Sequence, residues 1–273
     1  MVKAEEIRVC VMRVGGTNCD AETKRAFDEL GAKAEVLHFN EAVKRCNLLD
    51  YNALVFPGGF SYGDYVRAGA IWATGTMTRF KKDLERFVEE ERPVLGICNG
   101  FQVLVEAGLL PAFEGISEYP EATLATNIPI GYNCRWVYLK HENHGNCIFT
   151  KNIPENKVLH LPVAHGEGRF LFAKEKETRY LQKLIDNDQL VFRYCSRDGA
   201  AANGEYPVNP NGAFYDIAGI CNPGGTVFGL MPHPERAFYG WQLPDWTKTE
   251  TVSEYGDGKQ VFESMIEYLK KRF

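Results

Sequence analysis

The stretch Val94–Leu104, VLGICNGFQVL, places one cysteine between two glycines where an apolar run meets a helix-like pattern. Pro93–Cys98 has the apolar composition of a buried strand, and Phe101–Ala107 has the spacing of a helix. The pattern G-x-C-x-G around Cys98 is the thiol counterpart of the G-x-S-x-G elbow, in which a nucleophile stands on a sharp turn between a strand and a helix. A simple strand-to-helix turn would use the same residues, so the motif needs support from elsewhere in the chain.

Cys98 has the surroundings that a reactive thiol requires. Glycines two positions before and after it allow neighbouring backbone to pass close to a strained turn. The N–H groups at the start of the following helix would face the sulfur and favour the thiolate. The other seven cysteines are scattered singly without any C-x-x-C pair, so we interpret them as small buried residues or incidental surface thiols.

The first hundred residues alternate strand-like and helix-like segments. The predicted strands are Ile7–Val14, Ala34–Phe39, Ala53–Phe56 and Pro93–Cys98. Helices are predicted from Asp20, which we expect to cap the first of them, from about Gly69 to Glu91, and from Phe101. This order indicates an α/β fold in three layers, with a mostly parallel open sheet and flanking helices.

The second half of the chain has a different pattern. Between about 116 and 182, short apolar runs alternate with Asn, Gly and Pro, which predicts a small antiparallel extension. The runs are Cys134–Leu139, Cys147–Thr150 and Val158–Leu161. An apolar stripe over Val261–Leu269 predicts a last helix. We interpret the chain as a single domain, 1–273, with insertions near 117–160 and 237–257.

The composition excludes several classes of protein. The 273 residues are 45% hydrophobic and 25% charged, as in ordinary globular proteins. A net charge of −5 and the lack of a dense Lys/Arg block argue against a nucleic-acid partner. No apolar run approaches the roughly 18–20 residues that cross a bilayer, and the start MVKAEEIRV lacks the apolar core of a signal peptide. We therefore expect a cytoplasmic protein without a membrane partner.

His233 is the candidate base for a cysteine nucleophile. It lies in Gly229–Arg236, GLMPHPER, directly after the predicted strand Thr226–Leu230. In an extended segment Glu235 would point to the same side as His233, so its carboxylate could hold the imidazole in place. A structural His–Glu pair would explain H-x-E by itself, but together with the cysteine elbow the pattern predicts a catalytic triad.

Phe56–Asp64, FPGGFSYGD, has two glycines directly after a predicted strand. Their backbone N–H groups would lie at the carboxyl edge of the sheet, where open α/β folds bind ligands. The segment lacks the lysine and hydroxyl of a phosphate-binding loop. It therefore predicts an oxyanion hole, with one donor from this loop and one from the residue after the nucleophile, and a plain glycine-rich turn is the alternative.

His141, His144 and Cys147 have a spacing that is also found in zinc sites. A structural zinc site needs a further ligand, and the Asn-Gly sequence among these residues favours the tip of a hairpin. We therefore predict no metal in this chain.

Together, GICNG with Gln102, the upstream PGG and the downstream PHPE resemble the class I (triad) glutamine amidotransferases, whose fold is flavodoxin-like. Three longer motifs are similar to the glutaminase subunits of phosphoribosylformylglycinamidine synthase. They are Gly15–Asp20, Pro57–Gly69 and Pro162–Phe170. The resemblance runs from about residue 7 to 236.

The resemblance implies a role for each residue that matches a family motif. Cys98 is the nucleophile, His233 the general base and acid, and Glu235 the group that orients the imidazole. The backbone N–H groups of Gly59 and Asn99 form the oxyanion hole. The substrate-binding residues are Gly58, Ser61, Arg67, Gln102 and His165. Glu167 and Arg169 also match, and for the charged or titratable residues of this group a buried ion pair is the alternative role.

The resemblance further implies hydrolysis of L-glutamine to glutamate and ammonia through a γ-glutamyl thioester. Ammonia would pass to a larger synthetase subunit, which uses ATP to convert formylglycinamide ribonucleotide to formylglycinamidine ribonucleotide in purine (IMP) biosynthesis, with a small accessory subunit in the same complex. No cofactor is expected in this chain, since ATP and Mg²⁺ belong to the partner. The alternatives are another triad amidotransferase, a Cys-elbow hydrolase, in which a histidine often stands where this chain has Asn99, and a non-catalytic interaction subunit.

Overall fold

Five parallel strands form one half of a sheet in this computed structural model, which describes residues 2–45, 47–248 and 252–273. The strands are β1 (Arg8–Arg13), β2 (Lys33–His38), β3 (Ala53–Phe56), β4 (Val94–Ile97) and β11 (Val227–Leu230). They lie in the order β2-β1-β3-β4-β11. The four strands predicted in the first hundred residues are confirmed, and each ends within one residue of its expected bounds.

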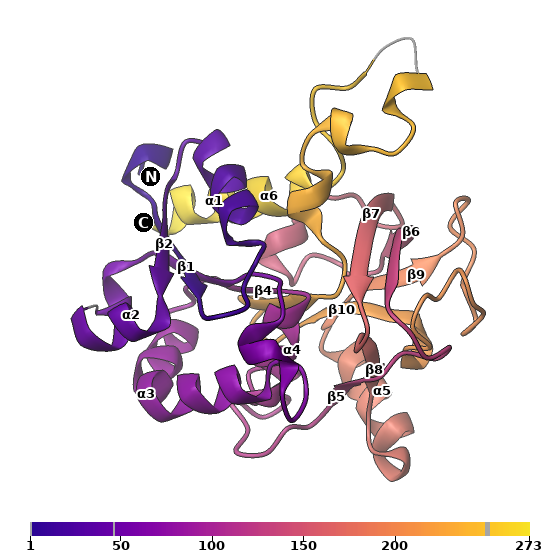
Figure 1. Cartoon of the computed structure of the whole chain (residues 1–273), viewed down its shortest axis with the longest axis horizontal. Helices are drawn as coiled ribbons and strands as arrows, with labels where there is room; N and C mark the ends of the chain where they lie inside the picture. Colours follow the sequence, from indigo (N-terminus) through magenta and orange to yellow (C-terminus); the bar gives the residue numbers. More distant parts are fainter. Residues whose placement is uncertain (1, 46, 249–251) are drawn as a thin grey trace.

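Four antiparallel strands continue the same sheet beyond β11 (Figure 1). They are β10 (Ile217–Cys221), β9 (Leu190–Cys195), β6 (Asn133–His141) and β7 (Val158–His165), in that order. The predicted antiparallel extension is therefore part of the main sheet, and β5 (Thr123–Ala125) pairs separately with β8 (Arg169–Leu171). The predicted strand Cys147–Thr150 is wrong: Ile148–Thr150 form a 3-10 turn, η4, that packs on the last helix.

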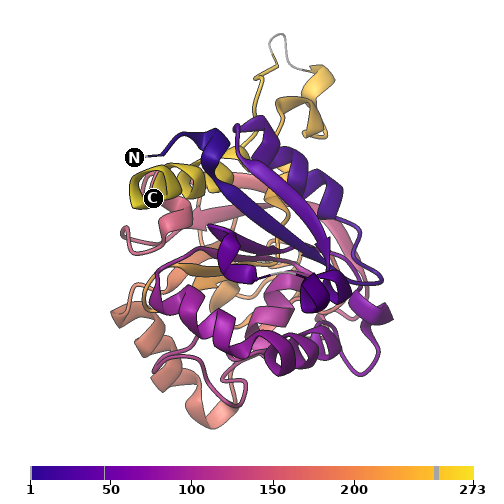
Figure 2. The same cartoon turned by 90° about the vertical axis from the view of Figure 1, so that its left-hand side faces the viewer.

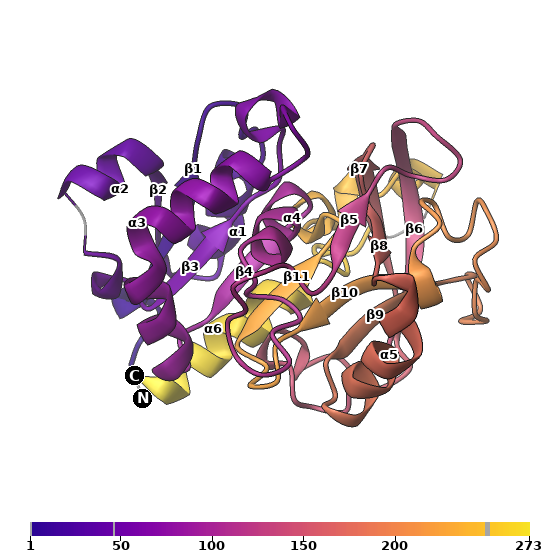
Figure 3. The same cartoon turned by 90° about the horizontal axis from the view of Figure 1, so that it is seen from below.

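Helices cover both faces of the sheet, which confirms the predicted fold class (Figures 2 and 3). They are α1 (Asp20–Glu29), α2 (Phe39–Arg45), α3 (Ala70–Glu89), α4 (Asn99–Glu106), α5 (Glu177–Asp186) and α6 (Lys259–Arg272). On one face Phe27 of α1 meets Phe262 of α6 edge to face, with ring centroids 5.1 Å apart. On the other face Trp72 of α3 meets Phe56 of β3 at 5.3 Å. None of the helices in the described residues is long and apolar enough to cross a membrane.

The first helix begins one residue earlier than predicted. Cys19 is the N-cap of α1 and Asp20 is the first helical residue, so Asp20 does not cap the helix. Its carboxylate instead pairs with Arg13 of β1 at 3.3 Å. Helix α2 follows β2 directly and was not predicted, because Phe39 was assigned to the strand. The two ends of the chain lie side by side (Figure 1), where the N–H of Val2 donates to the carbonyl of Lys270.

The two segments interpreted as insertions have different structures. The range 117–160 contains β5, β6 and η4, and β6 lies between two strands of the main sheet. The described part of 237–257 forms short 3-10 turns and a bridge between Tyr239 and Tyr255, and it projects from the body of the molecule (Figure 1). That both are insertions in one domain stays a prediction.

The glycines on either side of Cys98 allow α4 to lie against the sheet. A Cβ atom on Gly100 would overlap the carbonyl oxygen of Phe56 and lie 2.6 Å from its carbon. A Cβ atom on Gly96 would lie 2.7 Å from the carbonyl carbon of Gly100. Because any side chain at these positions would push α4 away from β3 and β4, the close approach requires both glycines.

The substitution Gly100→Ala tests this packing. The added methyl group would overlap backbone that cannot move without shifting β3, so we expect the free energy of unfolding to fall by about 3 kcal/mol. Urea denaturation measures it. Gly15→Ala is the matched control, since nothing lies within 4 Å of the Cβ position there. Equal stability of the two variants would contradict the role assigned to Gly100.

Candidate active site

Cys98 occupies the predicted elbow between β4 and α4. Its backbone angles, φ 51° and ψ −105°, lie in a region that residues other than glycine rarely adopt. The turn is held by a hydrogen bond from the N–H of Cys98 to the carbonyl of Leu230 at 2.8 Å. The thiol is buried at the N-terminus of α4 and donates to the carbonyl of Ala164 across 3.8 Å. Cys98 lines a cavity of about 140 Å³ at the carboxyl edge of the sheet.

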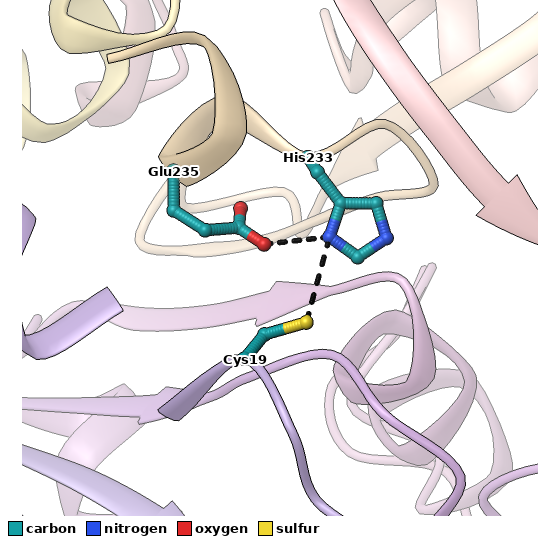
Figure 4. A group of neighbouring side chains, drawn as sticks. All are labelled: Cys19, His233 and Glu235. Atoms are coloured by element: carbon teal, nitrogen blue, oxygen red, sulfur yellow. Dashed lines mark hydrogen bonds and ion pairs between the residues drawn. The ribbon is translucent and has the colours of Figure 1, made fainter. Parts of the chain in front are cut away.

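His233 and Glu235 form a buried pair (Figure 4), and His233 is close enough to Cys98 to interact with it. Nδ1 of His233 lies 2.6 Å from Oε1 of Glu235, and the N–H of His233 donates to the carbonyl of Pro162 at 2.8 Å. We predicted the contact on the basis of an extended segment, but Pro234–Ala237 form a 3-10 turn, η7. The turn, not the alternation of an extended strand, brings the carboxylate to the imidazole.

The electrostatics of the pair favour a protonated imidazole. Burial alone disfavours the charged form of His233, but the negative charge of Glu235, together with the neighbouring Cys98, outweighs it and raises the pKa of His233 well above 6.5. Nε2 of His233 makes no hydrogen bond within the described residues and is therefore free to exchange a proton with a reacting group. This is the arrangement in which an imidazolium stabilises a thiolate and later donates its proton.

The two predicted oxyanion donors both have free N–H groups. Asn99 is the first residue of α4, where the N–H has no acceptor within the helix. Gly59 lines the cavity with Cys98, and no backbone hydrogen bond among the described residues uses its N–H. Gly59 has φ 151°, and a Cβ atom there would lie 2.7 Å from the carbonyl oxygen of Gly16. Their role in holding an oxyanion stays a prediction.

The loop Gly15–Asp20 supports the loop that carries Gly59. The N–H groups of Phe60 and Tyr62 donate to the carbonyls of Gly16 and Gly15 at 2.9 and 2.8 Å, and the N–H of Cys19 donates to the carbonyl of Gly58 at 3.2 Å. A Cβ atom on Gly16 would lie 2.9 Å from the carbonyl carbon of Phe60. The sequence motif at 15–20 therefore has a structural role, because it braces a predicted oxyanion donor.

Cys19 is a neighbour of the His233–Glu235 pair that the sequence did not reveal (Figure 4). Its Sγ lies 3.9 Å from Nδ1 of His233 and accepts a hydrogen bond from Nη2 of Arg236 at 3.2 Å. Burial raises the pKa of the Cys19 thiol to about 12, so it stays neutral beside the imidazole. We interpreted it, with the other scattered cysteines, as a small buried residue or an incidental surface thiol, and it is buried. Its position inside the motif Gly15–Asp20 was the one signal that could have singled it out.

Cys19, His233 and Glu235 are also the one group of three metal-ligand side chains in the described residues whose ligand atoms lie within 4.8 Å of one another. A cation there would compete with the guanidinium of Arg236 and break the His233–Glu235 hydrogen bond. His141, His144 and Cys147 form no such group. Nδ1 of His141 bonds to the carbonyl of Pro154, and His144 is exposed and pairs with Glu155 at 3.0 Å.

Comparison with known proteins identifies the family. The sequence model of the CobB/CobQ-like glutamine amidotransferase domain matches residues 6–269. The chain belongs to this amidotransferase family. It is 48% identical to phosphoribosylformylglycinamidine synthase subunit PurQ of Archaeoglobus fulgidus, over 98% of each chain. It is 42% identical to the subunit of the same name from Methanococcus maripaludis, over 97% of this chain and 98% of that one.

A solved structure agrees with these relatives. In the structure of PurLQS from Thermotoga maritima, the full length of one chain matches 97% of this amidotransferase. The two chains are 31% identical, and the TM-score is 0.73. The resemblance to class I glutamine amidotransferases that the sequence predicted is confirmed, and so is the fold that it implied.

The structure places the predicted substrate-binding residues of the amidotransferase in different environments. Gln102 and His165 line the cavity with Cys98. Gly58 lies under the imidazole, because a Cβ atom there would be 2.7 Å from Cε1 of His233. Ser61 is buried, and its N–H donates to Oδ1 of Asn99 at 3.2 Å. These residues therefore lie within or just behind the cavity wall, and substrate contact stays a prediction for each.

Arg67 does not line the cavity. Its guanidinium forms a bidentate pair with Glu106 of α4, in which Nε lies 2.7 Å from Oε1. The ion pair of the alternative is present, but it is not buried as predicted, since the Arg67 side chain is about half exposed. Arg169, on β8, keeps a buried Nε without a hydrogen-bond partner in the described residues. Glu167 lines the cavity together with Asp64, whose position the sequence did not predict.

The substitution Glu235→Gln tests the buried pair. Loss of the orienting carboxylate in a triad lowers kcat by about 10⁴-fold. Because Glu235 raises the pKa of His233 against the effect of burial, that pKa should fall and the imidazole should lose its proton at lower pH than in the wild type. Glutamine hydrolysis and NMR titration of the His233 ring measure the two effects.

Glu22→Gln is the matched control, since Glu22 pairs with Arg236 at 2.7 Å on the outer side of the same cluster. We expect near-normal hydrolysis for this variant. An unchanged pKa of His233 in the Glu235→Gln protein would show that the carboxylate does not set the protonation of the base.

Proposed function

We propose that this chain is the glutaminase subunit of a phosphoribosylformylglycinamidine synthase. The observation that carries the proposal is the assembly of Cys98 on a strained elbow with the buried His233–Glu235 pair. The relatives that match the chain over nearly its full length are named phosphoribosylformylglycinamidine synthase subunit PurQ. The substrate is L-glutamine and the products are glutamate and ammonia.

The geometry supports a two-step hydrolysis. The Cys98 thiolate attacks the carbon of the glutamine side-chain amide, and the negative charge that develops on oxygen is stabilised by the N–H groups of Gly59 and Asn99. Loss of one such donor costs about 3–4 kcal/mol of transition-state stabilisation in comparable sites. His233 donates its proton to the leaving ammonia and then takes a proton from the water that hydrolyses the γ-glutamyl thioester. Glu235 keeps the imidazole oriented through both steps.

The proposal assigns the synthetase chemistry to another chain. The Thermotoga maritima structure is named as PurLQS, a complex of several subunits. We infer a larger synthetase subunit that binds ATP and Mg²⁺ and uses the ammonia to convert formylglycinamide ribonucleotide to formylglycinamidine ribonucleotide in purine biosynthesis, and a small accessory subunit. Because a catalytic thiol must stay reduced, the proposal includes a cytoplasmic location.

Exposed apolar side chains occur in the two loops that supply Asp64 and Tyr132 to the cavity wall. We call five of them the apolar rim: two follow Asp64 in the chain, two precede Tyr132, and the fifth is Tyr132 itself. They are Tyr65, Val66, Ile128, Ile130 and Tyr132, with exposed fractions of 75%, 86%, 53%, 88% and 55%. Tyr132 lies against Phe60, with ring centroids 6.2 Å apart. Large apolar side chains gathered at a site mouth mark an interaction surface, and a partner seated here would keep ammonia from escaping to water.

The substitution Ile130→Asp tests the rim. A charge in an apolar interface is buried without a partner, so we expect the affinity for the synthetase subunit to fall by about 10-fold or more. Titration calorimetry with that subunit measures it. Ile185→Asp, at a half-exposed position on α5, is the control and should bind normally. If both variants bind like the wild type, the synthetase does not use the rim.

The substitution Cys98→Ala tests the function itself. Removal of the thiol leaves no nucleophile, so we expect glutamine-dependent synthesis of formylglycinamidine ribonucleotide to disappear in the assembled complex. Synthesis from added ammonia should persist, because the ATP-dependent site lies on the partner. Cys134→Ala, at an exposed cysteine, is the control and should keep both activities. Glutamine-dependent synthesis by the Cys98→Ala complex would refute the proposed mechanism.

A further inference from the structure

Two carboxylates face the cavity that contains the nucleophile. Asp64 and Glu167 come from separate loops, and both line the cavity of about 140 Å³ with Cys98. Oδ1 of Asp64 accepts a hydrogen bond from Nδ2 of Asn99 at 3.3 Å, and Oε2 of Glu167 accepts from the N–H of Ala68 at 3.1 Å. Hydrogen bonds thus hold the two groups in place.

In the part of the chain that the structure describes, neither carboxylate has a cation within ion-pair distance. Among the described residues no Lys, Arg or His forms an ion pair with Asp64 or Glu167. Arg67, the cation nearest in sequence to Asp64, forms its ion pair with Glu106, and its charge also acts on Glu167 from outside ion-pair distance. Burial and the charge of Glu167 together raise the pKa of Asp64 to about 6. Two partly buried like charges without a directly paired cation are unfavourable, and a cationic ligand would lower that cost.

The loop that presents Asp64 is strained. Tyr62, Asp64 and Val66 have φ values of 54°, 53° and 74°, which are uncommon for residues other than glycine. Such strain persists where the surrounding structure holds it, and it concentrates at ligand sites. Here the conformation turns Asp64 toward the cavity while its neighbours Tyr65 and Val66 stay exposed.

A second feature of the cavity points to a small polar ligand. His165 lines it and is almost fully buried, yet its Nε2 has no hydrogen-bond partner in the described residues. Buried polar atoms are nearly always hydrogen-bonded, so an unpartnered one at a cavity wall indicates a missing partner. The volume is well below the roughly 300–1,000 Å³ of sites for drug-sized ligands and suits a ligand of the size of one amino acid.

We propose that Asp64 and Glu167 bind the α-ammonium group of L-glutamine and so make the site specific for the free amino acid. The inference rests on the proposed glutaminase function and adds the basis of its specificity. With the side-chain amide at Cys98, the cationic end of the substrate extends to the two carboxylates in the same cavity. Peptide-bound glutamine and simple primary amides lack that charge and would leave the carboxylates unpaired.

A substrate without the α-amino group tests the assignment. The assembled complex is assayed for ammonia release from L-glutamine and from 5-amino-5-oxopentanoate, which is glutamine with hydrogen in place of that group. The variants are Asp64→Asn and Glu167→Gln, which keep the shape of each side chain and remove its charge. Glu175→Gln, at an exposed position on η5 (Lys174–Lys176), is the matched control.

We expect the wild type and the control to prefer L-glutamine strongly. Each charge-removing variant should lower kcat/KM for L-glutamine by about 10- to 100-fold, mainly through KM, because a hydrogen bond to a charged group is worth about 1.5–3 kcal/mol. The same variants should hydrolyse the analogue within about threefold of the wild-type rate, because the analogue never made the contact. If one of the two variants fails to fold, the other still tests the assignment.

Equal losses on both substrates would overturn the inference, since they would show a structural role for the carboxylates. So would an unchanged preference for L-glutamine in both variants. A wild-type complex that releases ammonia from neither substrate would instead refute the glutaminase function, and the inference would fall with it.

Discussion

The contact between α4 and β3 is the constraint on which the candidate active site depends. Because Gly100 has no side chain, α4 begins directly against the carbonyl of Phe56, and the chain must reverse sharply at Cys98 to reach that position. The strained turn at Cys98 and the first N–H of α4, which has no acceptor within the helix, both result from this packing. The packing of the surrounding core holds the backbone of Cys98 in a conformation that it would not adopt alone.

The buried pair of His233 and Glu235 also serves function more than stability. An ion pair taken out of water contributes little net stability, because the desolvation of both groups offsets their attraction. Its value here is orientation, since the imidazole is bounded by Glu235, by Gly58 and by the neutral thiol of Cys19. Cys19 also separates the imidazole from the guanidinium of Arg236, whose charge would oppose protonation of the base.

The predictable features were those whose signal lies within a few neighbouring residues. The parallel strands, the elbow at Cys98 and the His233–Glu235 pair follow from local apolar patterns and short motifs. The wrong strand at Cys147–Thr150 was an apolar run whose burial comes from packing on α6, which a pattern of alternation cannot distinguish from a sheet. Cys19 and Asp64 were missed because their contacts join loops that are far apart in the sequence.

These long-range contacts connect the predicted oxyanion hole to Asp64 and Glu167, the two carboxylates proposed to bind the substrate. The side chain of Asn99 accepts from the N–H of Ser61 and donates to Asp64, while its own N–H is a predicted oxyanion donor. A substrate ammonium that neutralises Asp64 would leave this network intact and remove its one unfavourable charge contact, the repulsion from Glu167. Binding at the amino end of glutamine would therefore stabilise the loop that completes the site at the amide end. Such a connection directs binding energy from a non-reacting part of the substrate to the reacting centre.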